Sequence, residues 1–429
     1  MSKEKISLYL AILININIVI GGGFFLSIQA ISPRTGVLAP LIWLSVALLL
    51  LPLTIVLAKL SRTEAVSGGL YVYSRKKLGE FWGFLSGWGY LIGTAAGNAV
   101  ILHGFRKLSE ELGLTNYLFN SFGISGIGAD IFFIIFFTLL NLFNIKILGK
   151  TQGLITILKT IPFAIVILGG LCLFKVTNFT LAPPTNISNF MSTIPIALFA
   201  YIGIEACCAI SHIIKDGKKN TAKVILISFM IIAGIYSLIQ FLLIGIHGTH
   251  FINPFTSIIP KLTNNPSVIK YGNIIIQSAI LSSFLGGYYS MFYANNWNIF
   301  AIAKENKLPF SKSLTKLNRY RGPWVCILAQ TFIVILFLTI TTKTTSLIVM
   351  SNFGVSIAYL LSCFAFFLNY KSKKNKFVGM LALAGCGYLL YLCFNDLLLE
   401  GFKYLIPYLI ILGLGILGYK IKTLQTKKS

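Results

Sequence analysis

The stretch Ile18-Val-Ile-Gly-Gly-Gly-Phe-Phe25 decides how this sequence is interpreted, because three adjacent glycines interrupt a long apolar run. Each glycine weakens a helix by about 1 kcal/mol relative to alanine. Gly21, Gly22 and Gly23 therefore predict an unwound segment in mid-span, followed by a half-helix that begins near Phe24. Small residues also permit close helix–helix contact, and the triplet by itself is compatible with that interpretation.

An unwound segment at this position has a chemical consequence. It would free backbone amides at the start of the half-helix, and such amides carry partial positive charge that suits a carboxylate. Non-helical backbone at membrane depth is tolerated only where it faces protein or a cavity. The glycine triplet therefore predicts a cavity that binds a small solute.

The composition places the surrounding chain in a membrane. Of its 429 residues, 56% are hydrophobic and only 11% are charged. A soluble domain of this length needs a more polar shell, so most of the chain is expected in a lipid bilayer. The net charge of +25 comes from Lys and Arg in short gaps between apolar runs rather than on one exposed face. Nucleic acid is therefore not expected as a partner.

The apolar runs predict twelve spanning helices, since a bilayer core of about 30 Å needs roughly 20 residues in helical form. The first run lacks a small-residue cleavage site and is predicted to be an uncleaved span. The predicted spans are Ile6–Ala30, Val37–Ala58, Phe81–Leu102, Ile127–Leu148, Leu154–Phe174, Ile194–Ile214, Val224–Ile246, Tyr271–Ala303, Trp324–Thr341, Ser346–Leu368, Phe377–Phe394 and Phe402–Tyr419.

The distribution of Lys and Arg orients these spans. If the N-terminus is cytoplasmic, the inner segments hold 27 of the 36 basic residues and the outer segments hold 8. Basic residues concentrate on the cytoplasmic side of membrane proteins, and one missed span would reverse every later loop. We therefore expect a multi-pass protein of the cell membrane with both termini in the cytoplasm.

Two ionisable residues lie within the apolar runs. Glu205 ends the segment Phe199-Ala-Tyr-Ile-Gly-Ile-Glu205 in the sixth run, and Lys159 lies about five residues into the fifth. A charged group in hydrocarbon costs free energy and is by default a functional hypothesis. As alternatives, Glu205 could be protonated and bonded to a backbone carbonyl, and Lys159 could extend its ammonium to the inner interface.

Several motifs, in the same order, resemble the amino acid–polyamine–organocation (APC) superfamily. Besides the glycine triplet and the Glu205 segment, they include Ser67-Gly-Gly-Leu-Tyr-Val-Tyr-Ser-Arg75, Phe84-Leu-Ser-Gly-Trp88 and Ala303-Lys-Glu-Asn-Lys-Leu-Pro309. The resemblance runs from about Lys5 to Leu336 and implies a leucine-transporter-like fold. In that fold helices 1 and 6 are broken, residues 1–175 and 190–370 form inverted repeats of five spans, and residues 371–429 add two more spans.

The resemblance also implies the residues of a substrate site, and these positions look most like the arginine/agmatine antiporter and its relatives. Backbone amides at the triplet would bind the substrate carboxylate, and unwound carbonyls near the sixth-span break would face its ammonium. Tyr288 stands where those relatives have a gating Trp. The substrate-binding residues expected on this basis are Gly21, Gly22, Gly23, Asn98, Ala200, Tyr201, Ile202, Gly203 and Tyr288.

The resemblance gives the two buried charges roles as well. Lys159 matches a lysine of sodium-independent members, where its ammonium replaces sodium and links the first and fifth spans. Glu205 would hold the broken sixth helix or carry a proton. The rival cue is Ser282-Ser283, since paired hydroxyls at that depth help to coordinate sodium in other branches. Two cations in one small cavity repel each other, so only one of these readings should hold.

We therefore expect a secondary active transporter of amino acids, either an exchanger or a proton-coupled carrier, with a sodium-coupled symporter as the alternative. No cofactor or metal is expected, and the protein could be a monomer or a homodimer.

Two other classes of protein are less consistent with the sequence. An enzyme would need a converging set of catalytic side chains. The four histidines are expected to lack acidic partners, because no Asp is expected within the membrane. A sensor would usually add a soluble domain, and neither tail exceeds a few residues. The histidines are His103, His212, His247 and His250.

Overall fold

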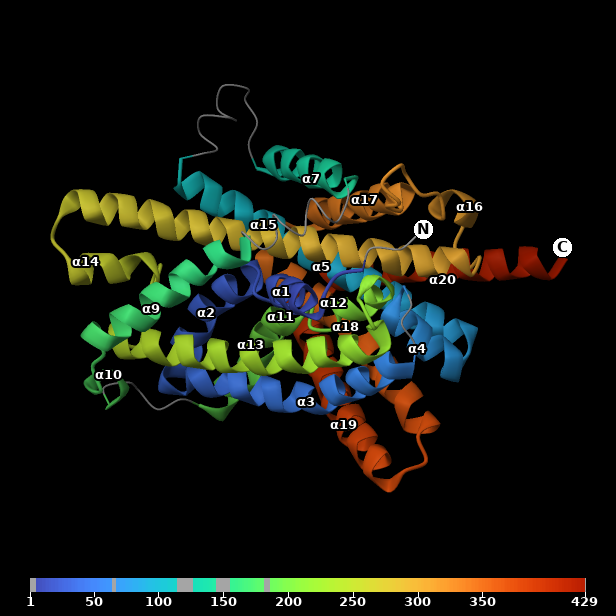
Figure 1. The fold of residues 1–429 in the computed structure, drawn as a ribbon, viewed down its shortest axis with the longest axis horizontal. Helices are drawn as coiled ribbons and strands as arrows, with labels where there is room; N and C mark the ends of the chain where they lie inside the picture. Colours follow the sequence, from blue (N-terminus) through green and yellow to red (C-terminus); the bar gives the residue numbers. More distant parts are fainter. Residues whose placement is uncertain (1–4, 64–66, 114–125, 144–154, 181–185, 429) are drawn as a thin grey trace.

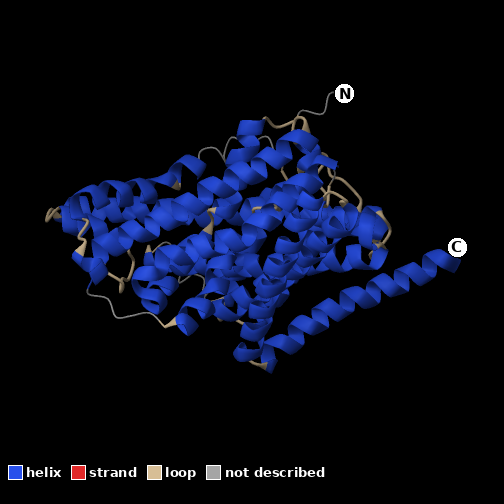
Figure 2. Cartoon of the chain, turned by 90° about the horizontal axis from the view of Figure 1, so that it is seen from below, coloured by secondary structure: helices blue, strands red, loops and turns tan. Residues whose placement is uncertain are grey.

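The chain folds into a bundle of helices. The computed structural model describes residues 5–63, 67–113, 126–143, 155–180 and 186–428. Within these residues the helices are joined by short loops, with two isolated β-bridges and no strand, as Figure 2 shows. The described helices are α1 Leu8–Val19, α2 Gly22–Thr35, α3 Ala39–Thr63, α4 Gly69–Leu78, α5 Glu80–Glu111, α7 Ile127–Asn141, α9 Thr160–Leu173, α10 Thr177–Thr180, α11 Ile187–Tyr201, α12 Ala206–Ala209, α13 Gly217–His247, α14 Ile259–Leu262, α15 Pro266–Lys304, α16 Ser311–Leu314, α17 Trp324–Ile340, α18 Thr344–Asn369, α19 Lys373–Glu400 and α20 Phe402–Lys428.

Many of these helices are suited to a bilayer. Eight helical segments of the described chain are long and apolar enough to cross a membrane, and α1, α7 and α17 are shorter apolar helices. Each predicted span overlaps at least one described helix, although residues 144–148 and 154, at the fourth and fifth spans, lie outside the described residues. The helices α3 and α13 run side by side in Figure 1, and α20 extends away from the bundle at the C-terminus. The architecture is that of an all-helical, multi-pass membrane protein.

The first predicted span is interrupted at the glycine triplet. Helix α1 ends at Val19 and α2 begins at Gly22, with Gly21 in an extended conformation between them. The predicted start near Phe24 is therefore two residues too late. A Cβ on Gly22 would lie 2.4 Å from the ring of Phe284, and one on Gly23 would lie 3.3 Å from the ring of Phe199. Gly21 is the residue at the break, whereas Gly22 and Gly23 allow α2 to pack closely against α15 and α11.

A second break interrupts the sixth predicted span. Helix α11 ends at Tyr201, and the chain turns through Gly203, whose φ of +109° favours glycine, before α12 begins at Ala206. The two breaks touch each other. The side-chain amide of Asn15 on α1 donates to the carbonyl of Ile204 at 3.3 Å. Two unwound segments far apart in sequence thus lie together inside the bundle.

An aromatic cluster fixes the start of α2. The Phe24 ring stacks on Tyr236 of α13 at a centroid distance of 4.2 Å, and it also contacts Trp43 and Phe163. The Tyr236 hydroxyl lies 3.0 Å from the carbonyl oxygen of Val19 and 3.1 Å from that of Ala200. One hydroxyl of α13 therefore lies within hydrogen-bond distance of a carbonyl group at each break, and the Val19 carbonyl also accepts from the Gly21 amide at 2.8 Å, as buried backbone oxygens require.

Helices α5 and α18 approach closely because glycines line their contact. A Cβ on Gly93 would lie 2.7 Å from the backbone nitrogen of Val355, and one on Gly354 would lie 2.7 Å from the carbonyl oxygen of Gly89. Backbone atoms cannot move aside as a flexible side chain can. This contact therefore sets the distance between α5 and α18.

We predict that Gly93→Val separates α5 from α18 and removes most of the folded, monodisperse protein. Overpacking of a well-packed interior typically costs about 1–3 kcal/mol, and a clash with backbone is at the costly end. The measurement is size-exclusion chromatography with thermal melting of the detergent-purified protein. Gly413→Val on α20, where an added Cβ meets nothing within 4 Å, is the control and should behave like the wild type. Equal melting temperatures for the two variants would contradict this account.

Candidate functional site

A small cavity, which we call the central cavity, lies between the two breaks and has a volume of about 30 Å³. Residues from the end of α1, the start of α2, the end of α11, and the middle of α5, α15 and α18 surround it. No charged side chain is among these lining residues. The lining residues are Ile18, Val19, Gly21, Gly23, Thr94, Gly97, Asn98, Ile101, Phe199, Ile202, Met291 and Ser351.

The structure places four of the expected substrate residues in this lining, namely Gly21, Gly23, Asn98 and Ile202. Asn98 is fully buried, and neither its amide nitrogen nor its oxygen has a hydrogen-bond partner within the described chain. A buried amide without partners costs free energy unless a ligand or water satisfies it. Asn98 is therefore an available polar contact for a bound solute.

The other five expected residues lie beside the cavity rather than in its lining. Gly22 faces Phe284, the Ala200 carbonyl contacts Tyr236, and the Gly203 amide contacts Glu205. The Tyr201 hydroxyl donates to the carbonyl of Trp43 at 3.0 Å. Tyr288 is buried between Phe137 and Phe292, with ring centroids 4.6 and 5.4 Å away.

Several lining residues were not expected from the sequence. Thr94 and Ile101 share one face of α5 with Asn98, at spacings of four and three residues, so the helical period could have identified them. Ser351 on α18 had no such signal. Its hydroxyl is buried and has no partner in the described structure, like the amide of Asn98. The two groups are therefore candidates for contact with the polar part of a ligand.

Lys159 lies where α1 is broken. Its side chain is buried, and the ammonium donates to the carbonyl oxygens of Asn17 at 3.0 Å and Ile20 at 2.5 Å. A cation at the C-terminal end of a helix interacts favourably with the helix dipole. The ammonium does not extend to the inner interface, and it ties the residues before α9 to the end of α1.

Glu205 holds the second break. Its carboxylate accepts hydrogen bonds from the hydroxyls of Tyr90 at 2.8 Å and Tyr359 at 2.6 Å, and both oxygens lie 3.2 Å from the amide nitrogen of Gly203. All three groups donate, which suits an ionised carboxylate. Tyr90 belongs to α5 and Tyr359 to α18, so Glu205 joins the break to both neighbouring helices.

The serine pair that could instead help to coordinate sodium, Ser282 and Ser283, lies on α15. The Ser282 hydroxyl donates to the carbonyl of Ala279 at 2.7 Å, whereas the buried Ser283 hydroxyl has no partner in the described residues. Sodium, like other hard cations, would need several oxygen ligands. The carbonyl oxygens of Asn17 and Ile20 at the α1 break already accept from Lys159. This arrangement favours the ammonium over a second cation.

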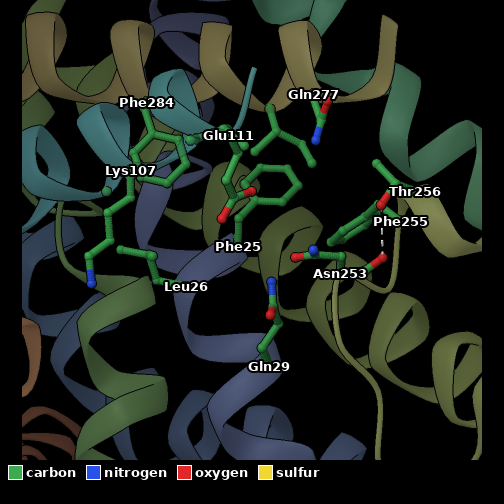
Figure 3. A pocket seen from close by; sticks show the side chains of 13 residues that line it. Phe25, Leu26, Gln29, Lys107, Glu111, Asn253, Phe255, Thr256, Gln277 and Phe284 are labelled. Carbon is green, nitrogen blue, oxygen red and sulfur yellow. Dashed lines mark hydrogen bonds between the residues drawn. The ribbon is translucent and has the colours of Figure 1, made fainter. Parts of the chain in front are cut away.

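A larger pocket of about 230 Å³ lies beyond the start of α2. In Figure 3 the polar ends of Gln29, Glu111 and Asn253 face its interior, next to the Phe25 ring. Phe284 also lines it, and the same ring fills the space left by two glycines: an added Cβ on Gly22 or on Gly104 would lie 2.4 Å from it. The Phe284 ring thus lines the larger pocket and also packs against the start of α2.

One expectation about ionisable groups is wrong. Asp130, in the first turn of α7, is fully buried and accepts from the Arg106 guanidinium at 3.0 Å. The His103 ring nitrogen lies 3.5 Å from the same carboxylate and 3.2 Å from Arg106. A buried Asp thus exists near the end of a span, and His103 has an acidic partner. The sequence did not reveal this burial, because Asp130 lies only three residues inside an apolar run.

Asp130, Arg106 and His103 together join α5 to α7. Glu110, also on α5, pairs with Arg106 at 2.5 Å.

Comparison with known proteins identifies the relatives of this chain. Residues 6–416 match the family described as amino acid permease. The serine/threonine exchanger SteT of Bacillus subtilis is 28% identical over 408 residues, which cover 90% of each chain. An arginine/ornithine antiporter of Pseudomonas aeruginosa is 26% identical over 357 residues, covering 79% of this chain and 72% of that protein. The arginine/ornithine antiporter ArcD2 of Lactococcus lactis is 25% identical over 433 residues, covering 91% and 84%.

We predict that Gly22→Ala destabilises the protein because the new methyl group overlaps the Phe284 ring. The expected cost is about 1–3 kcal/mol, seen as a fall of a few degrees in the melting temperature of the purified protein. Phe284→Leu in the same chain should restore much of this loss, since the smaller side chain vacates the contact.

The control is Gly234→Ala on α13, where an added Cβ meets nothing within 4 Å. It should leave the melting temperature unchanged. A Gly22→Ala variant as stable as the wild type, or one that Phe284→Leu does not improve, would show that Phe284 does not occupy this space.

Proposed function

Because this chain belongs to the amino acid permease family, we propose that it exchanges small, uncharged amino acids across the cell membrane without sodium, by alternating access. It is a multi-pass membrane protein and a secondary active transporter of amino acids. The proposal concerns the finer points: the substrate, the coupling, the orientation and the residues of the site.

The lining of the central cavity is the observation that carries the choice of substrate. It is small and contains no charged side chain, and its free polar groups are the Asn98 amide and the Ser351 hydroxyl. An arginine or ornithine side chain would bring a cation into this space without a carboxylate to pair with it, at a high cost in free energy. A hydroxyl group would find a donor and an acceptor. The name of the relative SteT, a serine/threonine exchanger, agrees with this preference.

The backbone of the substrate would be bound by the two breaks. The amides of Gly22 and Gly23 begin α2 and would face the carboxylate, because helix N-termini carry partial positive charge. The carbonyl groups at the end of α11, near Ala200 and Tyr201, would face the ammonium. Tyr288 and Phe199 would shape the space around the side chain. Gly21, Ile202 and Gly203 would supply the turns that keep the two helix ends apart.

The arrangement of spans is part of the proposal. Residues 1–175 and 190–370 would form two inverted repeats, each beginning with a broken helix, and residues 371–429 would add two spans. The breaks after α1 and after α11 support this, because each interrupts what would be the first span of a repeat. The excess of basic residues in alternate loops supports cytoplasmic termini.

Exchange without sodium rests on Lys159, whose ammonium would replace a bound cation at the α1 break. Glu205 would hold the α11 break, with Tyr90 and Tyr359 as its partners. A sodium-coupled symporter is the second candidate, and the unpartnered Ser283 hydroxyl is the observation that favours it.

We predict that the purified protein in liposomes loaded with unlabelled serine takes up labelled serine and threonine, equally well in sodium and in potassium buffers. Arginine and ornithine should compete at least about tenfold more weakly, because a cationic side chain has no counter-charge in the cavity. Faster exchange of arginine than of serine would overturn the substrate assignment. Uptake that requires sodium would instead favour the Ser283 site.

We predict that Ser351→Ala raises the KM for serine about tenfold, as expected for the loss of one buried hydrogen bond of about 1.4 kcal/mol, and leaves the KM for alanine nearly unchanged. Kinetic measurements on the same liposomes give both values. Ser188 on α11 is exposed, and the control variant Ser188→Ala should change neither the KM for serine nor the KM for alanine. An equal rise in the KM for serine and the KM for alanine would mean that Ser351 only packs against α5.

We predict that Lys159→Met reduces exchange at least about tenfold while the protein is still produced and purified. The methionine side chain is similar in length, but it cannot donate to the Asn17 and Ile20 carbonyl oxygens, which then lack partners in a dry interior. Lys270→Met, at an exposed position on α15, is the matched control and should keep full activity. Full activity of Lys159→Met in potassium buffer would contradict the role proposed for the ammonium.

A further inference from the structure

A group of basic side chains gathers where α3 ends and α19 begins. Helices α3 and α19 pack against each other, which brings residues about 310 positions apart in sequence to one place (Figure 1). The Lys59 ammonium contacts the side-chain oxygen of Asn375 and lies 5.9 Å from the centre of the Phe366 ring. We call these residues the basic cluster: Lys59, Arg62, Lys371, Lys373, Lys374 and Lys376.

Within the described residues, the positive charges of the basic cluster have no acidic partner. Lys374 and Arg62 are close enough to Lys59 to repel its charge. Like charges at such distances destabilise one another unless an anion lies between them.

Another basic group of the same protein shows the contrast. Arg75 on α4 pairs with Glu305 at 2.6 Å, and Lys307 pairs with Glu80 at 3.2 Å. These basic residues also lie in segments predicted to be cytoplasmic, yet they have carboxylate partners. The topology of a membrane protein requires only that inner loops be basic. It does not require that two distant segments bring unpaired cations together.

The surface beside the basic cluster is apolar. Phe364 and Leu368 near the end of α18, and Phe377, Met380 and Leu381 near the start of α19, are 43–58% exposed in the isolated chain. In a bilayer these side chains would meet acyl chains, while the basic residues would lie at the level of the head groups. A ligand that satisfies both features carries an anionic group and long apolar chains.

We propose that the basic cluster is a binding site for an anionic phospholipid. The phosphate lies among the ammonium and guanidinium groups of α3 and the α18–α19 junction, and the acyl chains lie along Leu368, Phe377 and Met380. Clusters of four or more basic residues directly beside a span attract anionic head groups. Lys and Arg side chains reach the head-group level while their carbon stems stay in apolar surroundings.

A bound lipid would stabilise the packing of α3 against α19, next to the helix α18 that lines the central cavity. The lipid would join the end of α3 to the start of α19, and α19 packs along α18, which carries Ser351 and Tyr359. Lipid binding is measured directly and does not depend on which amino acid is transported.

The test is native mass spectrometry of the full-length protein, purified in detergent and mixed with either phosphatidylglycerol or phosphatidylcholine. The wild type should retain phosphatidylglycerol and little phosphatidylcholine. In the triple variant Lys371→Gln, Lys373→Gln, Lys374→Gln, binding of phosphatidylglycerol should be at least about tenfold weaker, because three of six charges are removed. Equal melting temperatures in lipid-free detergent would verify that the variant is folded.

The matched control removes three exposed lysines around the start of α13, by Lys215→Gln, Lys218→Gln and Lys219→Gln. This variant has the same net charge as the first and should bind phosphatidylglycerol like the wild type. An equal loss in both variants would reduce the effect to net charge, and no loss in the first would remove the site. Displacement of the lipid by millimolar inorganic phosphate would also overturn the proposal, since it would indicate a site for the free anion.

Discussion

A polypeptide backbone inside a bilayer must satisfy its own hydrogen bonds, and this constraint governs the centre of the structure. The interruption of α1 removes helical partners from the carbonyl groups of Asn17, Val19 and Ile20, of which Val19 accepts from the Gly21 amide at 2.8 Å, and the interruption of α11 frees the carbonyl of Ala200 and the amide of Gly203. Each of these groups has a partner. Lys159 donates to Asn17 and Ile20, the Tyr236 hydroxyl lies within hydrogen-bond distance of Val19 and Ala200, and Glu205 accepts from Gly203. The breaks persist because side chains from other helices replace the lost helical bonds.

These partners come from the helices that surround the breaks. Tyr236 belongs to α13, Lys159 directly precedes α9, and the tyrosines that position Glu205 belong to α5 and α18. The lining of the central cavity therefore depends on packing contacts some distance from it. The close approach of α5 and α18 at Gly93 keeps Tyr90 and Tyr359 within reach of the same carboxylate. A displacement of either helix would lengthen a hydrogen bond at the α11 break.

The sequence predicted the elements whose signals are local. Three adjacent glycines disfavour a helix, and a charge within an apolar run is costly, so the first break, Lys159 and Glu205 were all identifiable. It did not separate the roles of the three glycines, because the Phe284 and Phe199 rings that approach Gly22 and Gly23 come from α15 and α11. The sequence did not identify Ser351 or Tyr236 for a similar reason. A Ser or Tyr in an apolar helix carries no local signal of the contacts that it makes in the folded protein. The burial of Asp130 is not visible in the sequence, because its partners Arg106 and His103 come from α5.

The charges at the two breaks bear on what the cavity can hold. Lys159 offsets the partial negative charge at the C-terminal end of α1, and Glu205 lies against the amide of Gly203, so each full charge is matched by backbone dipoles outside the lining. In the proposed site, the amides that begin α2 and the carbonyl groups that end α11 would present two weaker fields of opposite sign to a ligand. A zwitterion has its two charges a few ångströms apart and fits between such fields. A simple amine or a simple acid would leave one of them unmatched, which favours the complete α-amino acid as the ligand of the proposed site.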